Sequence, residues 1–263
     1  MSQAIADRVL KASGRAWWAV AAVGQFAFVG YVILFYGRTA AEGDFERWNE
    51  VLVGGYRSGQ PVGNLALAAH LALAVVITAG GLLQLVPAIR ARAPWLHRWN
   101  GRVFLTCALV ASLAGVGLVW TRGTAGELAM RAGITVNAVL IIVCGLLAWR
   151  LAAARRFDAH RRWALRAFVL VSGVWFFRVG LMAWILANRG PVGIGEDFDG
   201  PFVRFWAYGC YLVPLAGVEL WMGAWRGGRV AKLVAAVVVG LLTLVTALGV
   251  FGTIAGMWLP RVV

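Results

Sequence analysis

Seven long apolar runs, separated by short polar segments, make up most of this 263-residue chain. An α-helix rises about 1.5 Å per residue, so about 20 apolar residues cross the hydrocarbon core of a bilayer, which is about 30 Å thick. The pattern therefore predicts an all-α integral membrane protein, a seven-transmembrane-helix bundle forming a single domain over 1–263. The predicted spans are 16–36, 64–87, 101–121, 130–150, 163–187, 202–223 and 230–258.

The basic residues are distributed unevenly between the two sides that these spans define. With the N-terminus in the cytoplasm, 16 Lys and Arg residues lie on the cytoplasmic side and 8 on the opposite side. Membrane insertion favours Lys and Arg in cytoplasmic loops, so the count predicts an N-terminus inside and a C-terminus outside. Arg outnumbers Lys by 23 to 2, and Ala, Gly and Val are abundant. This composition favours a bacterial source and hence the cell inner (plasma) membrane.

Composition also narrows the classes of partner. Hydrophobic residues make up 61% of the chain and charged residues 14%, whereas soluble domains carry about 25% charged residues. The net charge of +14 predicts an anionic partner. Because the basic residues flank the spans and no basic soluble domain remains, we expect that partner to be anionic lipid at the cytoplasmic face, and we expect no nucleic acid.

Three polar residues lie at a similar depth in three different spans. His70, Asn137 and Arg178 are about six, seven and nine residues from the predicted outer ends of their spans, or roughly 10–14 Å into the membrane. A guanidinium at that depth needs polar partners or water. We therefore predict a ligand pocket in the outer half of the bundle. The alternative is an interhelical hydrogen-bond cluster that only fixes packing.

Two further polar residues are candidates for this pocket. Gln84 lies on the same helical face as His70, in a stripe of small and polar residues spaced by three and four. Such a stripe is expected to face other helices rather than lipid. Glu219 lies near the inner end of 202–223, where we expect it to pair with Arg102 or Arg166.

Two short segments are similar to each other, HRWNGRVF at 97–104 and HRRWALRAF at 160–168. Each stands where a basic loop meets the cytoplasmic end of a predicted span. Helix N-termini attract anions through unpaired N–H groups and the positive end of the helix dipole. We predict that the segments lie side by side as an inner anion-binding rim, for lipid head groups or for a cofactor or substrate with phosphate or carboxylate groups. The rim residues are His97, Arg98, Arg102, His160, Arg161 and Arg166.

A family resemblance rests on the same residues. The pattern comprises His70, Gly80-Gly81, Gln84, Pro94-x-x-His97-Arg98-x-x-Gly101-Arg102, His160-x-x-Trp163-x-x-Arg166, Arg178, Pro214 and Glu219. It resembles the bacterial multi-pass membrane proteins grouped as domain of unknown function 2306, over about residues 64–222. The resemblance implies one membrane domain and marks these residues as a set, but it implies no established reaction.

Three functions follow as hypotheses. The first is binding of a small molecule or anionic lipid in the polar intramembrane pocket, with transport as one use of it. The second is membrane redox work, with haem b between His97 and His160 or a quinone near His70 and Arg178. The third is an accessory or sensory role without catalysis. The chain has no Gly-x-Ser-x-Gly, His-Glu-x-x-His or P-loop motif, so catalytic residues and metal ligands stay unassigned.

Overall fold

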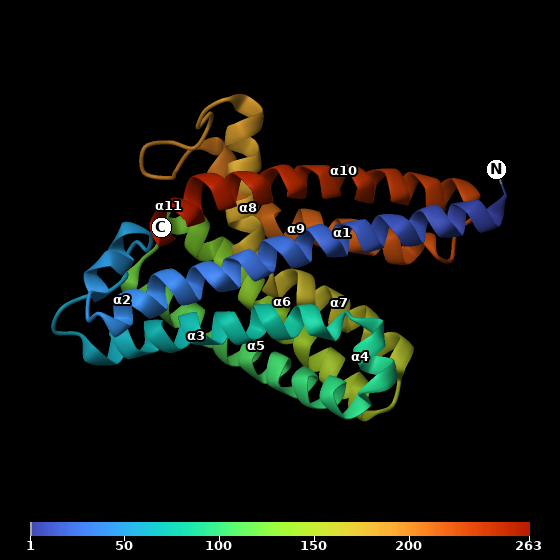
Figure 1. The fold of residues 1–263 in the computed structure, drawn as a ribbon, viewed down its shortest axis with the longest axis horizontal. Helices are drawn as coiled ribbons and strands as arrows, with labels where there is room; N and C mark the ends of the chain where they lie inside the picture. The colour runs from blue at the N-terminus through green and yellow to red at the C-terminus, as the bar shows by residue number, and fades with distance from the viewer. Residues whose placement is uncertain (1) are drawn as a thin grey trace.

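The computed structural model describes residues 2–263, except for the side chain of Glu127. Within that range every regular element is helical (Figure 1), which confirms the predicted all-α class. The elements are α1 (Gln3–Tyr31), η1 (Val32–Gly37), α2 (Arg38–Ala41), η2 (Phe45–Glu50), α3 (Pro61–Gln84), α4 (Pro87–Arg92), α5 (Pro94–Arg122), α6 (Glu127–Ala153), α7 (Phe157–Val171), α8 (Gly173–Asn188), α9 (Pro201–Ala224), α10 (Arg229–Thr253), η3 (Ile254–Trp258) and α11 (Leu259–Val262).

Local sequence signals explain where several helices begin and end. Pro61, Pro94 and Pro201 stand at the starts of α3, α5 and α9, where the missing N–H of proline needs no partner. Gly123 follows α5 with φ +85°, and Gly126 precedes α6 with φ +74°. Such positive φ values cost little only for glycine. The connection between α5 and α6 is therefore short, and the two helices lie side by side as neighbours.

Among the described residues, five helical segments are long and apolar enough to cross a membrane: Gln3–Ala41, Pro61–Gln84, Pro94–Arg122, Leu128–Ala153 and Arg229–Val262. The pair α7 and α8 makes a sixth if it is counted as one bent span. Helix α9 is as long as α3 but is not among these spans, because Arg204 and Glu219 lower its apolarity. Length and composition thus support five to six spans rather than the seven read from the sequence.

The predicted span 163–187 is not one continuous helix, which corrects the sequence interpretation. It breaks at Ser172, and α7 and α8 meet at an angle of 56°. Ser172 donates its hydroxyl proton to the Phe168 carbonyl at 2.9 Å, while Asn137 of α6 donates to the Leu170 carbonyl at 3.1 Å. Side chains therefore satisfy carbonyls at the break, and a Ser-Gly pair is a common place for a helix to kink.

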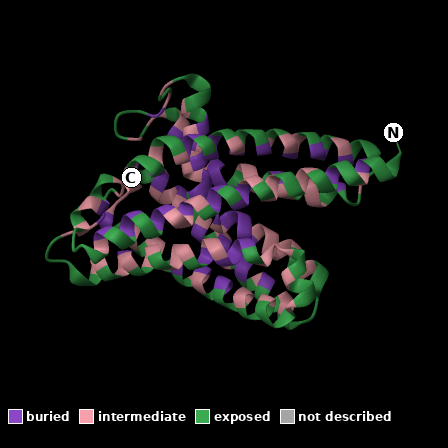
Figure 2. Cartoon of the chain, viewed as in Figure 1, coloured by how far each residue is buried: buried purple, intermediate pink, exposed green. Residues whose placement is uncertain are grey.

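The two chain termini lie at opposite ends of the bundle (Figure 1). We call these ends the N-terminal end, which also carries α4, and the C-terminal end, which also carries α2. Helix α1 packs along α10, α3 packs against α5, and α6 packs against both α5 and α7. Towards the N-terminal end, α1, α9 and α10 separate from the other long helices (Figure 1), and buried residues concentrate near the middle, where the two groups meet (Figure 2).

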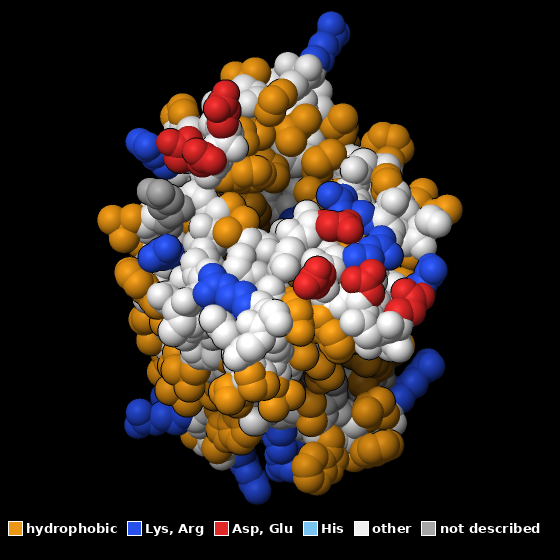
Figure 3. Space-filling model, turned by 90° about the vertical axis from the view of Figure 1, so that its left-hand side faces the viewer, with side chains coloured by type: hydrophobic (Ala, Val, Ile, Leu, Met, Phe, Trp, Pro, Cys, Tyr) orange, Lys and Arg blue, Asp and Glu red, His pale blue; other side chains and the backbone are white. Residues whose placement is uncertain are grey.

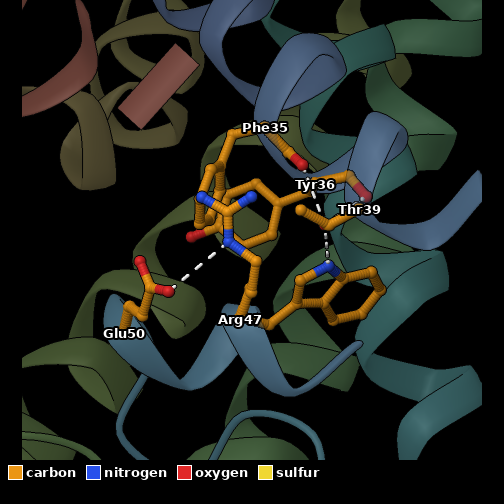
Figure 4. A network of polar contacts seen from close by, with 6 residues as sticks. Phe35, Tyr36, Thr39, Arg47 and Glu50 are labelled. Atoms are coloured by element: carbon orange, nitrogen blue, oxygen red, sulfur yellow. Dashed lines mark hydrogen bonds and ion pairs between the residues drawn. The ribbon is translucent and has the colours of Figure 1, made fainter. Parts of the chain in front are cut away.

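The segment 42–60 is anchored to the C-terminal end of the first helix. Trp48 Nε1 donates to Thr39 Oγ1 at 2.9 Å, and Thr39 Oγ1 donates to the Phe35 carbonyl at 2.8 Å. Arg47 lies over the Phe35 ring, 5.6 Å from its centroid, and pairs with Glu50 at 3.5 Å (Figure 4). Because Trp48 and Thr39 are buried, this anchor fixes the loop that follows, which lies against the end of α5.

Candidate functional site

A long cavity of about 300 Å³ follows one face of α5. Its wall residues on this helix run from Phe104 to Arg122, a rise of about 27 Å. The stripe between them includes Ala108, Ala111, Ser112 and Gly115. These side chains are small, so they leave a space that larger residues would fill. The remaining walls come from α1, α3, α6, α7 and α8, together with the loop 52–54.

The cavity opens at the C-terminal end of the bundle. Residues 52–54 and 122–124 line its mouth, and Figure 3 shows this face with a hollow near its centre, bordered by apolar side chains. At the other end, the buried rings of Phe104 and Phe168 lie against Gly81, where a Cβ would come within 2.9 Å and 3.1 Å of them, respectively. The cavity is therefore accessible from one end and ends at two phenyl rings.

Polar side chains from different helices share the wall of this cavity. They are His70 of α3 and Asn137 of α6, together with Gln25 of α1, Ser112 of α5 and Ser172 at the break between α7 and α8. The sequence placed His70 and Asn137 at one depth, and the structure puts both in one cavity. Gln25 Nε2 donates to Ser172 Oγ at 3.0 Å, so α1 is tied directly to the helix break.

Four of the wall residues carry a buried polar atom without a hydrogen-bond partner among the described residues. The atoms are Gln25 Oε1, His70 Nδ1, Asn137 Oδ1 and Trp175 Nε1. Buried polar groups in proteins are nearly always paired, and an unpaired one costs about 1–3 kcal/mol. Four such atoms belong to this wall, each covered by neighbouring side chains, and seven others lie elsewhere among the described residues.

Arg122 is the one charged side chain among the described wall residues. It is 7% exposed and donates to the Gly55 carbonyl, to Gln60 Oε1 at 3.4 Å and to Asn64 Oδ1 at 2.9 Å. A Cβ on Gly63 would approach its Nη2 to 2.4 Å. Arg122 therefore holds the loop 55–60 against α3 through three of its five N–H donors.

Arg178 does not line the cavity, in contrast to the predicted pocket. Its guanidinium lies over the Phe28 ring, 5.6 Å from the centroid, and donates to the Val174 carbonyl at 3.3 Å. Phe28 and Val174 are themselves wall residues. Arg178 is therefore half-buried behind the wall, because the 56° bend turns α8 away from the direction that a straight span would take.

Gln84 and Glu219 also lie outside the cavity. Gln84 Nε2 donates to the His97 carbonyl at 3.1 Å, near the N-terminal end. Glu219 forms a two-point ion pair with Arg166, at 2.5 Å and 2.8 Å, which confirms one of its two expected partners. Both residues lie too far along their helices to reach His70, since a helix rises about 1.5 Å per residue.

The two similar segments begin at the N-terminal end. His97 lies in the first turn of α5, and His160 lies in the first turn of α7. His160 Nδ1 lies 2.9 Å from the Ala148 carbonyl. A carbonyl only accepts, so this nitrogen carries a proton. Neither histidine lines the cavity or the groove described below.

The arginines of the predicted rim are mostly held by neighbours. Arg102 lies over the Trp99 ring at 5.0 Å and Arg161 pairs with Asp158 at 3.6 Å, while Arg166 pairs with Glu219. Arg98 is exposed and has no partner among the described residues. The rim therefore offers less free positive charge than the sequence predicted, because local pairs were not visible from residue spacing alone.

A basic groove of about 360 Å³ lies between α7 and α9 at the N-terminal end. Arg166 is fixed there by Glu219 and by the Trp163 ring, 4.5 Å away. Arg162 and Arg226 line the same groove and have no partner in the part of the chain that the structure describes. The groove can therefore bind an anion through two free guanidinium groups.

Sequence reasoning missed several of these residues. Ser172 was not singled out, although a Ser-Gly pair inside an apolar run is a signal for a break. Arg122 was counted among the flanking basic residues, and Arg162 and Arg226 likewise. The mid-span position of Gln25 marked it as a polar residue in the membrane, which is costly, but the sequence alone left open which polar layer it joins; it is 1% exposed.

Comparison with known proteins identifies a family. A family model described as predicted membrane protein (DUF2306) matches residues 67–222, which are 156 of the 263 residues. The chain belongs to this family, as the sequence pattern predicted. The matched part runs from α3 to α9 and contains His70, Asn137 and Ser172. Neither the curated proteins nor the solved structures include a match to this chain.

Proposed function

We propose that this DUF2306 protein binds a small molecule in the cavity along α5. The cavity has the features of a ligand site, because it is concave, mostly apolar and lined by a few polar groups from several helices. Its polar groups concentrate at a broken helix, and discontinuous helices commonly form binding sites in membrane transporters. Transport is one use of such a cavity, whose open mouth and phenyl floor are described above.

The orientation of this site in the membrane is part of the proposal. Counting α7 with α8 as one bent span and α9 as a further span gives seven crossings, consistent with termini at opposite ends of the bundle. The count of 16 basic residues against 8 favours a cytoplasmic N-terminal end. In the inner membrane of a bacterium, the cavity then opens to the outside.

One observation carries the proposal. Gln25, His70 and Asn137 come from three helices, line one cavity and each keep a buried polar atom without a partner. A cluster that served only to fix packing would be expected to pair these atoms with each other. Their unpaired state supports a wall that is completed by a bound molecule.

A blocking substitution tests the proposal. Ser112 is buried on the wall in the middle of α5, whereas its neighbour Leu113 is 65% exposed and does not line the cavity. Native mass spectrometry of the protein extracted in mild detergent should detect a bound small molecule in the wild type and in Leu113→Phe, and none in Ser112→Phe. A wild type that carries no small molecule, or an unaffected Ser112→Phe variant, would contradict the proposal.

A second candidate function is binding of an anionic lipid head group in the basic groove. The free guanidinium groups of Arg162 and Arg226 support it, since basic pockets between helices on the cytoplasmic side bind anionic lipids. The double substitution R162Q/R226Q should weaken binding to phosphatidylglycerol vesicles severalfold. The control R155Q/R156Q removes the same charge from exposed positions at the same end; an equal loss in both variants would exclude a specific site.

The redox alternative has less support. Neither His97 nor His160 lines one of the two cavities described above, and a porphyrin needs a slot between its ligands. The quinone hypothesis places the ligand near both His70 and Arg178, but Arg178 does not line the cavity that contains His70. Small-molecule binding therefore comes first.

A further inference from the structure

The hydrogen-bond roles at the helix break can be worked out from chemistry. Ser172 Oγ lies 2.9 Å from the Phe168 carbonyl, which only accepts, so the single hydroxyl proton points there. The same oxygen must then accept from Gln25, 3.0 Å away. The amide of Gln25 is therefore fixed with Nε2 towards Ser172, and its Oε1 is left as an unpaired acceptor.

The same reasoning fixes Asn137. Its Nδ2 lies 3.1 Å from the Leu170 carbonyl, and a flipped amide would place two acceptors against each other. The Asn137 Oδ1 atom is consequently a second unpaired acceptor. Both oxygens are covered by neighbouring side chains, so that a ligand reaches them after a small side-chain movement, as is common on binding.

The charges of the wall limit what can bind there. The described wall residues include no Asp or Glu, so a cationic ligand would be buried without a counter-ion, which is costly. Arg122 is bound to the loop 55–60 and to Asn64, and it lies ten residues, or about 15 Å, along α5 from Ser112. An anion would bring further acceptor oxygens to Gln25 and Asn137. A neutral molecule with hydroxyl groups avoids both the buried unpaired charge and the contact between acceptors.

Building on the proposed ligand-binding function, we infer that the ligand is a neutral amphiphile with at least two hydrogen-bond donors, of the diol or dihydroxy-aromatic class. Its hydroxyl groups bind at Gln25 and Asn137, beside the break between α7 and α8. Its apolar part follows the small-residue stripe of α5 towards the mouth. The stripe from Ala108 to Gly115 rises about 10 Å along α5, which fits a molecule with a short chain.

Three matched probes test this ligand class by isothermal titration calorimetry in detergent. Hexylresorcinol has two hydroxyl donors, and its dimethyl ether has the same ring and chain without donors. The third probe, the carboxylate 4-hexylbenzoate, is an anion with the same chain on the ring. We expect hexylresorcinol to bind at least about tenfold more tightly than either of the others, since two neutral hydrogen bonds are worth about that much. Gln25→Met and Asn137→Leu should each reduce this preference severalfold.

A control separates the cavity from general effects of losing a buried amide. Asn100 donates to the Gly80 carbonyl at 2.8 Å, outside the cavity wall, so Asn100→Leu should keep the preference. If all three probes bind equally, or if the ether or the benzoate binds best, and Ser112→Phe still abolishes binding, the ligand class is wrong while the binding function stands. If no probe binds, or if Ser112→Phe leaves binding unchanged, both the class and the proposed function fail.

Discussion

Arg122 and Arg178 have different environments in the structure. Arg122 donates to acceptors on the loop 55–60 and on α3 and is almost fully buried. Arg178 has one carbonyl and one aromatic ring as neighbours. A guanidinium spreads its donors in a planar fork, so it can serve several acceptors at once. Arg122 is therefore structural, whereas Arg178 donates only to the Val174 carbonyl among the described residues.

Substituting Arg122 by Lys should destabilise the C-terminal end. Lys has one compact donor group and cannot serve the Gly55 carbonyl, Gln60 and Asn64 together, so we expect a loss of about 1–3 kcal/mol. The melting temperature in detergent should fall, and limited proteolysis should cut the loop 51–60 more readily. Arg189→Lys is the control, because Arg189 is exposed; an equal drop in the control would show that Arg122 has no special role.

At the scale of elements, glycines decide how closely α10 approaches α8. A Cβ on Gly249 would lie 2.1 Å from the Val179 carbonyl oxygen, and one on Gly252 would lie 2.6 Å from Leu186 Cδ1. Gly252-x-x-x-Gly256 therefore packs inside the bundle, where Gly256 faces Met182. This contact supports α8, whose start forms part of the cavity wall, so helix packing far from the cavity shapes it.

Two substitutions in α10, Gly249→Ala and Gly240→Ala, test whether the close contact between α8 and α10 stabilises the protein. The first adds a methyl group where the α8 backbone lies, and a forced shift of this kind costs typically about 1–3 kcal/mol. The second adds it where no atom lies within 4 Å, and should be neutral or stabilising by up to about 1 kcal/mol. Thermal unfolding in detergent distinguishes them. Equal melting temperatures would mean that α8 and α10 do not need close contact.

At the scale of the whole molecule, the orientation of the bundle in the membrane decides to which side the cavity opens. The cavity opens at the C-terminal end, and the basic groove lies at the N-terminal end. In the proposed orientation, which rests on the uneven distribution of basic residues, the N-terminal end lies in the cytoplasm. The cavity would then open outwards, and the basic groove would face the inner leaflet.

Reporter fusions test this orientation. A fusion after Arg92, in the short helix α4, should report the cytoplasm, and a fusion after Gly195, in the loop between α8 and α9, should report the outside. The expectation rests on 16 basic residues against 8 and on an odd number of crossings. If both fusions report the same compartment, the seven-span arrangement is wrong; if they report the reverse, its orientation is wrong.

The sequence by itself determined the class of the protein and the positions of most helices. Apolar length and helix periodicity are local properties, and they predicted α3, α5 and α6 to within a few residues at each boundary, except for the start of α5. The inward-facing stripe of α3 was also predictable, because His70 and Gln84 lie on one helical face. Family membership followed from residue spacing, which the match to residues 67–222 confirms.

Only the tertiary structure decided which polar residues share a site. Spacing gives depth along a helix, but the partner of a side chain depends on the rotation and tilt of its neighbours. The break at Ser172 turned Arg178 behind the cavity wall and brought Gln25 to the wall instead. The ion pair of Glu219 with Arg166 left Arg162 and Arg226 as the free cations of the groove. These outcomes depend on packing between distant segments, which no local pattern contains.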